Sequence, residues 1–156
     1  TTRGWFGGGS DLNPILPVDA DTKAFHVRLK EACDAHSPDY YDKYKAWCDE
    51  YFFNKHRNEP RGVGGIFYDY HDTGKWDDDF AFTQNVGKAF LDIYPKLVRQ
   101  HMVDNFTEQD KLTQSIKRGR YAEFNLVYDR GTKFGLMTGG NTEAILMSLP
   151  PEAKWI

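Results

Sequence analysis

The spacing of apolar residues changes along this chain, and that change most constrains the fold. Over the first two thirds, apolar residues recur at helical intervals, as in Phe25, Leu29 and Cys33. From Tyr121 to Tyr128, apolar and polar residues instead alternate with a period of two. The first pattern predicts amphipathic helices and the second predicts a strand with one buried face. The chain is therefore expected to be an α+β protein.

Four helices and two short strands are predicted before the alternating segment. The helices are expected over about 21–36, 39–56, 77–102 and 107–118, and the strands end near residue 9 and cover 66–68. Asp21 and Thr22 are expected to cap the first helix, and Thr107 and Asp110 form a capping pair for the last. Pro95 is expected to kink the third helix, because proline removes a backbone donor.

A β-meander is predicted for the rest of the chain. The strand over 121–128 is followed by turns at 129–132 and 139–141, with further strands over 134–137 and 143–148. Short turns imply antiparallel pairing, so an antiparallel sheet with helices against it is expected. Without an internal linker, residues 1–156 are expected to form a single domain. The chain lacks an initiating Met, so further residues are expected before it.

Composition and charge exclude several classes of protein. Forty per cent hydrophobic residues exclude general disorder, and a net charge of −3 gives no basis for nucleic-acid binding. No apolar run approaches the ~20 residues that span a bilayer, so no membrane span is expected. Cys33 and Cys48 lie on helical patterns beside aromatic residues, which predicts buried free thiols in a reducing, cytoplasmic compartment.

Three segments contain residues suited to chemistry, and each has a structural alternative. Gly7–Leu12 places Asp11 after three glycines, which fits either a close approach to a ligand or a loop with a capping Asp. Lys55–Arg61 contains three cations and His56, which fit either an anionic pocket or the end of a helix. Asp129–Lys133 fits either the orientation of an acidic substrate or an ion pair that closes a turn.

No local metal or nucleophile motif is present. The five histidines, His26, His36, His56, His71 and His101, have no H-x-x-H or H-x-x-x-H spacing. The two cysteines form no CxxC pair, and no G-x-S-x-G occurs.

The order of these segments nevertheless resembles one family over nearly the whole chain. The specific stretches are Trp5–Leu12, the Phe25–Asp34 helix, Lys45–Phe67, and Arg118–Pro151. Together they resemble the oxygen-dependent coproporphyrinogen III oxidases. Only residues 70–78 depart noticeably, as a variable loop would. The resemblance implies that the family's N-terminal region and short C-terminal tail lie beyond this chain.

The resemblance implies a fold and a reaction. The fold is a flat antiparallel β-sheet flanked by helices on both faces, in a homodimer. The reaction is the oxidative decarboxylation of two propionates of coproporphyrinogen III to vinyl groups, which gives protoporphyrinogen IX, carbon dioxide and hydrogen peroxide. Dioxygen is the co-substrate. No flavin, haem or redox metal is implied, and a divalent metal is an optional addition.

The family's residue roles can be placed on matching positions. Asp11 corresponds to a carboxylate that faces the pyrrole nitrogens, and Asp129 and Arg130 are the other catalytic candidates. Arg57, Arg61, Lys133, Gly139, Gly140 and Asn141 are implied to bind substrate. His26 and His56 match positions assigned as metal ligands. Tyr121, Phe124, Leu126 and Leu146 fall in the dimerisation region.

One position departs from the family pattern. The substrate-binding triplet is usually Gly-Gly-Arg, and here it is Gly139-Gly140-Asn141. Asparagine lacks the cationic fork of arginine, so backbone N–H groups or another cation would have to compensate. Two other functions remain open from sequence: a non-catalytic module that binds tetrapyrroles or acidic metabolites, and a purely structural dimerisation domain.

Overall fold

The computed structural model describes residues 4–156, which form two compact units. Unit 1 contains the residues up to 52 together with 62–104, and unit 2 contains 53–61 together with 105–156. The α+β class is confirmed, with helices and antiparallel strands along the same chain. The prediction of a single domain stays a prediction, since a compact unit need not fold by itself.

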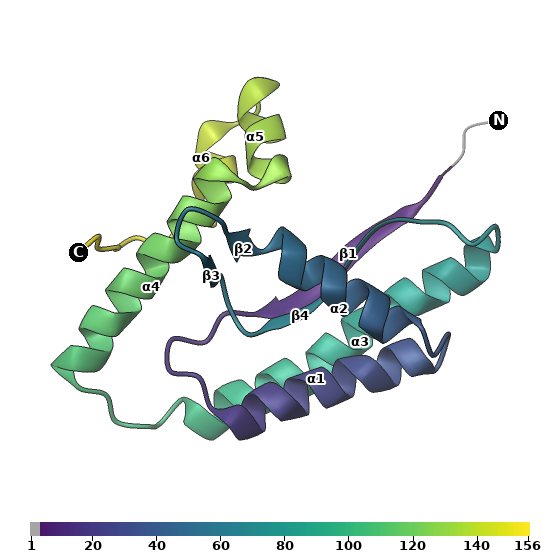
Figure 1. The fold of residues 1–156 in the computed structure, drawn as a ribbon, viewed down its shortest axis with the longest axis horizontal. Helices are drawn as coiled ribbons and strands as arrows, with labels where there is room; N and C mark the ends of the chain where they lie inside the picture. The colour runs from purple at the N-terminus through teal and green to yellow at the C-terminus, as the bar shows by residue number, and fades with distance from the viewer. Residues whose placement is uncertain (1–3) are drawn as a thin grey trace. The chain divides into compact units, whose positions relative to one another are not determined.

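Unit 1 combines a two-stranded antiparallel sheet with three helices (Figure 1). The elements are β1 (Phe6–Leu12), α1 (Asp19–Asp34), α2 (Tyr40–Tyr51), β4 (Gly64–His71) and α3 (Trp76–His101). Strands β1 and β4 pair with Ser10 opposite Ile66 and Asp11 opposite Gly65. Both predicted short strands are therefore confirmed, and each is longer than predicted.

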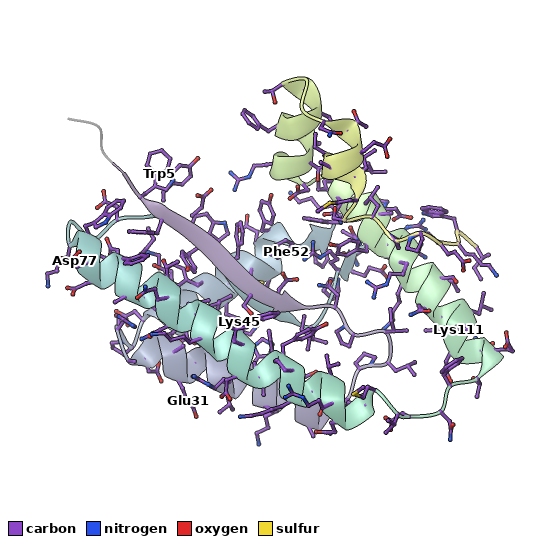
Figure 2. The ribbon with its side chains drawn as sticks, turned by 180° about the vertical axis from the view of Figure 1, so that it is seen from behind. Trp5, Glu31, Lys45, Phe52, Asp77 and Lys111 are labelled. Carbon is purple, nitrogen blue, oxygen red and sulfur yellow. The ribbon has the colours of Figure 1, made fainter. Side chains whose placement is uncertain are left out.

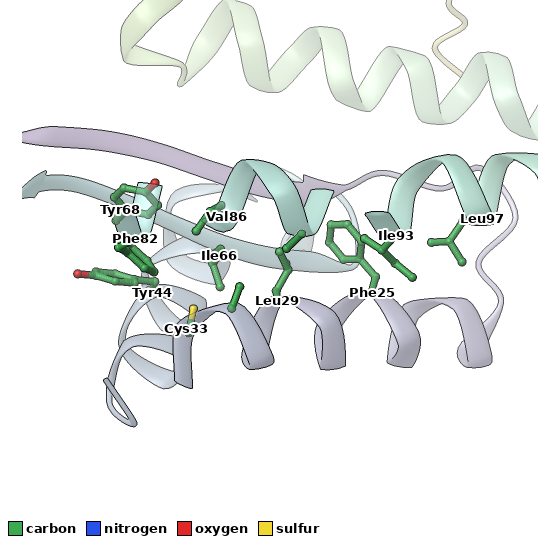
Figure 3. Packing of buried hydrophobic residues seen from close by; sticks show 12 residues of the cluster. Phe25, Leu29, Cys33, Tyr44, Ile66, Tyr68, Phe82, Val86, Ile93 and Leu97 are labelled. Atoms are coloured by element: carbon green, nitrogen blue, oxygen red, sulfur yellow. The ribbon is translucent and has the colours of Figure 1, made fainter. Parts of the chain in front are cut away.

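The core of unit 1 lies between the sheet and the helices (Figure 3). Helix α1 buries Phe25, Leu29 and Cys33, the residues that predicted it. Helix α3 lies beside α1 and buries apolar residues at intervals of three and four from Phe82 to Leu97. Both cysteines are buried free thiols, and burial raises the pKa of Cys33 to about 12. These thiols therefore pack as small apolar side chains.

The ends of the helices differ in part from prediction. Helix α1 begins at Asp19, and the Val18 carbonyl accepts the Thr22 N–H at 3.0 Å, so the predicted caps at Asp21 and Thr22 are wrong. Helix α3 contains Pro95 and continues to His101. Figure 2 shows Trp5 near the start of β1 and Asp77 at the start of α3. The rings of Phe6 and Trp76 pack there in a tilted arrangement, with centroids 4.5 Å apart and planes 45° from parallel.

A buried polar cluster joins the end of β4 to the start of α3. The His71 Nδ1 lies 2.7 Å from the Tyr44 hydroxyl, and its Nε2 lies 3.1 Å from Asp79 Oδ1. Asp79 also accepts the N–H and the hydroxyl of Thr73 at 2.9 and 2.7 Å. Burial lowers the pKa of His71, which favours the neutral ring. His71 therefore has a structural role, in keeping with its place in the aromatic core.

Unit 2 is built from a tight hairpin and three helices (Figure 1). The hairpin consists of β2 (Phe53–Asn54) and β3 (Glu59–Pro60), and the helices are α4 (Glu108–Val127), α5 (Arg130–Met137) and α6 (Thr142–Leu146). The helix predicted to reach residue 56 therefore ends at Tyr51. It gives way to the hairpin, whose turn places Asn58 in the left-handed region with a φ of 53°.

The predicted β-meander is wrong, because residues 121–128 continue a helix. The Thr107–Asp110 capping box is confirmed, and the helix it starts runs past residue 118 to Val127. Gly119, Ala122 and Asn125 are buried at intervals of three, and the Asn125 side chain donates to the Tyr121 carbonyl at 3.1 Å. The alternation of apolar and polar residues in this segment therefore did not indicate a strand, because the segment continues the long helix that precedes it.

The segments predicted as further strands are also helices. The turn predicted at 139–141 is confirmed, but it joins α5 to α6. A Cβ at Gly135 or Gly140 would lie 3.0 or 2.9 Å from Ile145 Cδ1, so these glycines let the two short helices approach closely. Within residues 4–156, no helix has the length and apolar character that crossing a membrane requires.

Candidate active site

Asp11 lies on the face of the sheet opposite the core. Ser10, Ile66 and Tyr68 face the core and are at least 93% buried. Successive side chains of a strand point to opposite faces. Gly9, Asp11 and their cross-strand partners Phe67 and Gly65 therefore share the other face. Asp11 is half-buried there, near the end of β1.

Glycines make this face of β1 flat beside Asp11. Gly7 and Gly9 are exposed and carry no side chain. A Cβ at Gly9 would lie 2.9 Å from the Ile66 carbonyl oxygen and 3.0 Å from the Phe67 ring. Phe67 in turn stacks on Tyr51, with ring centroids 4.7 Å apart and planes 23° from parallel. The Asp11 carboxylate thus lies beside exposed glycine backbone and an aromatic surface. This arrangement suits a planar ligand with N–H donors.

Two further glycines, Gly62 and Gly65, allow the segment that leads into β4 to lie close to β1. A Cβ at Gly65 would lie 2.0 Å from the Ser10 carbonyl oxygen, and one at Gly62 would lie 2.3 Å from that of Leu12. No real side chain tolerates such distances to backbone atoms. The glycine-rich segment from Gly62 to Gly65 therefore packs against the strand that carries Asp11.

Asn13 holds the Asp11 carboxylate and was not identified from the sequence. Its Nδ2 donates to Asp11 Oδ2 at 3.0 Å. Because Asn13 and Asp11 are two residues apart at the end of a strand, no periodic pattern in the sequence indicates their contact. The arrangement orients one carboxylate oxygen and suits a group that accepts a hydrogen bond or a proton from a ligand.

His26, predicted as a metal ligand, uses both ring nitrogens within unit 1. Nδ1 lies 2.9 Å from the Tyr41 hydroxyl, and Nε2 lies 2.9 Å from the Val63 carbonyl oxygen. A metal ion would have to displace one of these partners. The histidine links α1, α2 and the loop that precedes β4.

The cations of the hairpin lie against α4 in unit 2. Arg57 donates from Nη2 and Nε to the two oxygens of Glu123, at 2.6 and 3.0 Å. His56 Nε2 lies 2.6 Å from Glu123 Oε2, and its Nδ1 lies 3.0 Å from the Tyr128 hydroxyl. Arg120 bridges Glu59 and Glu123 at 3.0 and 3.4 Å. The interpretation of these cations as the end of a helix is wrong, since they lie on a hairpin loop.

Glu123 is the centre of this polar network, and sequence reasoning missed it. The bidentate Arg57 contact is the largest influence and lowers the pKa of Glu123 to about 2, with further help from His56 and Arg120. Arg61 lies over the rings of Tyr121 and Phe124, at 5.2 and 4.8 Å from their centroids. Arg57 would bind a substrate carboxylate only in competition with Glu123, whereas Arg61 is oriented by two aromatic rings.

The remaining predicted site residues lie on and between the short helices of unit 2. Asp129 caps α5 by accepting the Thr132 N–H at 2.6 Å, and Arg130 and Lys133 belong to the first turn of that helix. Gly139 has a φ of 71° and follows α5. Asn141 caps α6 by accepting the N–H groups of Glu143 and Ala144. The replacement of arginine by asparagine at 141 therefore supplies a helix cap.

The predicted dimer residues differ in their exposure. Tyr121, Phe124 and Leu126 lie on α4, and Leu146 ends α6. Phe124 is fully buried within unit 2, whereas Leu126 is 49% exposed. Their roles in a dimer stay predictions.

The described side chains do not fit a metal site. Over residues 4–156, no group of three His, Cys, Asp or Glu side chains is placed to hold a metal ion. His26 lies in unit 1 and His56 in unit 2, each with both ring nitrogens engaged.

Comparisons with known proteins identify the family of the chain. The family model described as coproporphyrinogen III oxidase matches residues 1–156. A protein of Rickettsia bellii named oxygen-dependent coproporphyrinogen-III oxidase is 61% identical over 155 residues, which are 99% of this chain and 56% of that protein. Proteins of the same name from Rickettsia africae and Rickettsia akari are 61% and 59% identical over the same shares. The chain thus spans little more than half the length of these relatives, and it belongs to the coproporphyrinogen III oxidase family.

Proposed function

We propose that this chain forms part of an oxygen-dependent coproporphyrinogen III oxidase. Each of two propionate side chains would lose its carboxyl group as carbon dioxide and a hydride equivalent from its β-carbon, leaving a vinyl group. The two electrons and two protons removed each time would reduce one dioxygen to hydrogen peroxide. The products are protoporphyrinogen IX, two carbon dioxide and two hydrogen peroxide.

The observation that carries the proposal is the placement of Asp11 on the flat glycine face of β1. Its carboxylate, oriented by Asn13, can accept hydrogen bonds from pyrrole N–H groups that converge on one point. Asp11 could equally accept a pyrrole proton, which would make the ring more electron-rich and more reactive with dioxygen. Dioxygen would then add to the ring as a peroxide, which takes the β-hydrogen and leaves as hydrogen peroxide when its bond to the ring breaks. Loss of carbon dioxide completes the vinyl group, and Asp11 returns its proton to the pyrrole nitrogen.

The substrate carries four carboxylates, which call for cationic partners. Arg61 and Lys133 are the candidates for this role within unit 2, with Arg57 released from Glu123 when substrate binds. Arginine suits such partners because its fork binds a carboxylate in bidentate fashion. Asp129 and Arg130 begin the same short helix as Lys133 and are proposed to orient the acidic substrate there.

We further propose that the protein acts in the cytoplasm as a homodimer and needs dioxygen without a bound cofactor. The dimer proposal is supported by large apolar side chains at the surface of α5 and α6: Phe134, Met137 and Met147 are 70%, 85% and 82% exposed. Clusters of exposed apolar side chains are typical of protein interfaces.

Incubation of the full-length protein with coproporphyrinogen III, in air and without oxygen, tests the activity. We expect protoporphyrinogen IX in air together with hydrogen peroxide, in a ratio of one to two, and neither product without oxygen. Substrate binding without turnover in air would favour the non-catalytic binding module. Absence of both binding and turnover would favour a structural role.

A further inference from the structure

His26 connects three segments of unit 1. It projects from α1, and its ring lies between the Tyr41 hydroxyl of α2 and the Val63 carbonyl oxygen of the loop before β4, at 2.9 Å from each. The ring also packs edge-on against the rings of Phe25 and Tyr41. A histidine that satisfies both nitrogens across three segments fixes their relative positions.

The partners define the protonation of the ring. A backbone carbonyl oxygen can only accept, so Nε2 carries the proton and donates it to Val63. Nδ1 is then the acceptor, and the Tyr41 hydroxyl donates to it. The Val63 carbonyl oxygen therefore selects the tautomer of the neutral ring, and the Tyr41 hydroxyl completes the pairing by donating to Nδ1.

The loop held by His26 is joined to the end of the strand that carries Asp11. The Val63 N–H donates to the Leu12 carbonyl at 2.9 Å, and Leu12 directly follows Asp11. Beside it, a Cβ at Gly62 would lie 2.7 Å from Asn13 Oδ1, so the loop also packs on the residue that binds the Asp11 carboxylate. Two short routes therefore lead from the His26 ring to Asp11: one through Val63 and Leu12, the other through Gly62 and Asn13.

We propose that His26 is a positioning residue for Asp11, acting through Val63. This inference rests on the proposed function, because it assumes that Asp11 takes part in turnover. Loss of the Nε2 donor would let the Val63 carbonyl shift, and the Leu12 carbonyl and Asn13 would shift with it. Small displacements of a catalytic group lower the rate more than they lower substrate binding.

Three variants of the full-length protein test this role. We expect His26→Leu to lower kcat by about 10- to 100-fold while KM changes by less than about threefold. Glutamine can place an amide N–H near the position of Nε2, so His26→Gln is expected to recover kcat to within about fivefold of wild type. Tyr41→Phe removes the hydrogen bond to Nδ1 but keeps the Nε2 donor, so its kcat should lie between those of the two His26 variants.

His36→Leu is the matched control. His36 is also a partly buried histidine of unit 1 and bridges two segments, with Nε2 2.7 Å from Asn85 Nδ2 of α3, but it does not contact the loop that Val63 belongs to. We expect it to lower the melting temperature about as much as His26→Leu does, with kcat retained. Hydrogen exchange at the Val63 amide should become faster in His26→Leu than in His36→Leu.

Several outcomes would overturn the proposal. Equal losses of kcat in His26→Leu and His36→Leu would show a general effect of stability. A kcat for His26→Leu within twofold of wild type, or a failure of His26→Gln to recover it, would also reject the role. If Asp11→Ala abolishes turnover while His26→Leu does not, the inference fails and the proposed function stands. If the wild-type protein has no oxidase activity, the proposed function fails, and Val63 exchange alone then decides whether His26 holds the loop.

Discussion

At the scale of single residues, the region around Asp11 depends on the absence of side chains. The Gly65 Cα position leaves no space for a methyl group, because an ideal Cβ would lie 2.0 Å from the Ser10 carbonyl oxygen. Gly87 lies in the interior of α3, where the described residues place nothing within 4 Å of an ideal Cβ apart from the local helix backbone. The two glycines therefore make a matched pair for substitution.

Gly65→Ala should destabilise the protein, and Gly87→Ala should stabilise it. A methyl group at Gly65 forces the strands apart, at an expected cost of about 3 kcal/mol in the free energy of unfolding. At Gly87, alanine removes the entropic penalty of glycine in a helix, with an expected gain of about 1 kcal/mol. Urea denaturation of both variants measures these changes. An unchanged midpoint for Gly65→Ala would contradict the close approach of β1 and β4.

The sequence was informative about residues whose expected roles depend on residues close to them in the chain. Asp11 after three glycines could be identified as a candidate site residue, which stays a prediction, and the Thr107–Asp110 capping box follows from spacing alone. Asn13 and Glu123 could not be recognised in this way. The partner of Glu123 is Arg57, 66 residues earlier, and only the tertiary structure brings the two together.

At the scale of elements, Glu123 joins the hairpin over 53–61 to α4. Its carboxylate is largely buried and accepts from Arg57 and Arg120, beside His56. Because the pKa of Glu123 is lowered to about 2 in the folded state, ionised Glu123 contributes stability above its usual pKa. That contribution is expected to be lost as the pH falls from about 4.5 towards 2.

Glu123→Gln should therefore lower stability at neutral pH and flatten its dependence on pH in this range. We expect a loss of about 1–3 kcal/mol at pH 7 that shrinks as the pH falls towards 2. Glu31→Gln is the control, because Glu31 is 62% exposed and lies 3.7 Å from Arg28, in an ion pair worth less than about 1 kcal/mol. Denaturation curves between pH 2 and 7 would measure both. A difference between Glu123→Gln and wild type that does not change with pH would contradict the network.

The elements of unit 1 followed from sequence better than those of unit 2. Helices α1 and α3 bury apolar residues at the spacing that predicted them. Residues 121–128 also alternate, and alternation over so few residues does not distinguish a strand from one face of a helix. Gly131 suggested a turn but lies in α5, whereas the turn suggested by Gly139 and Gly140 is present between α5 and α6. Gly135 and Gly140 also allow these two helices to pack closely.

At the scale of the whole molecule, the residues predicted to take part in function belong to two compact units, each described by itself. Unit 1 carries Asp11 with Asn13 and His26, and unit 2 carries the arginines and the helix caps at Asp129 and Asn141. The relatives are nearly twice as long as this chain. Family membership follows from these 156 residues, while activity is best measured on the full-length protein.

The most direct test of this account is the turnover of Asp11→Asn in the full-length protein, measured together with substrate binding. Asparagine keeps the size of the side chain but cannot act as a base, so we expect kcat to fall by at least about 100-fold while the Kd for coproporphyrinogen III changes by less than about tenfold. Asp69→Asn is the control, because Asp69 is another carboxylate on the same face of β4 as Phe67. It should retain turnover. If Asp11→Asn binds substrate and turns it over within twofold of the wild-type rate, the central role of this carboxylate is wrong.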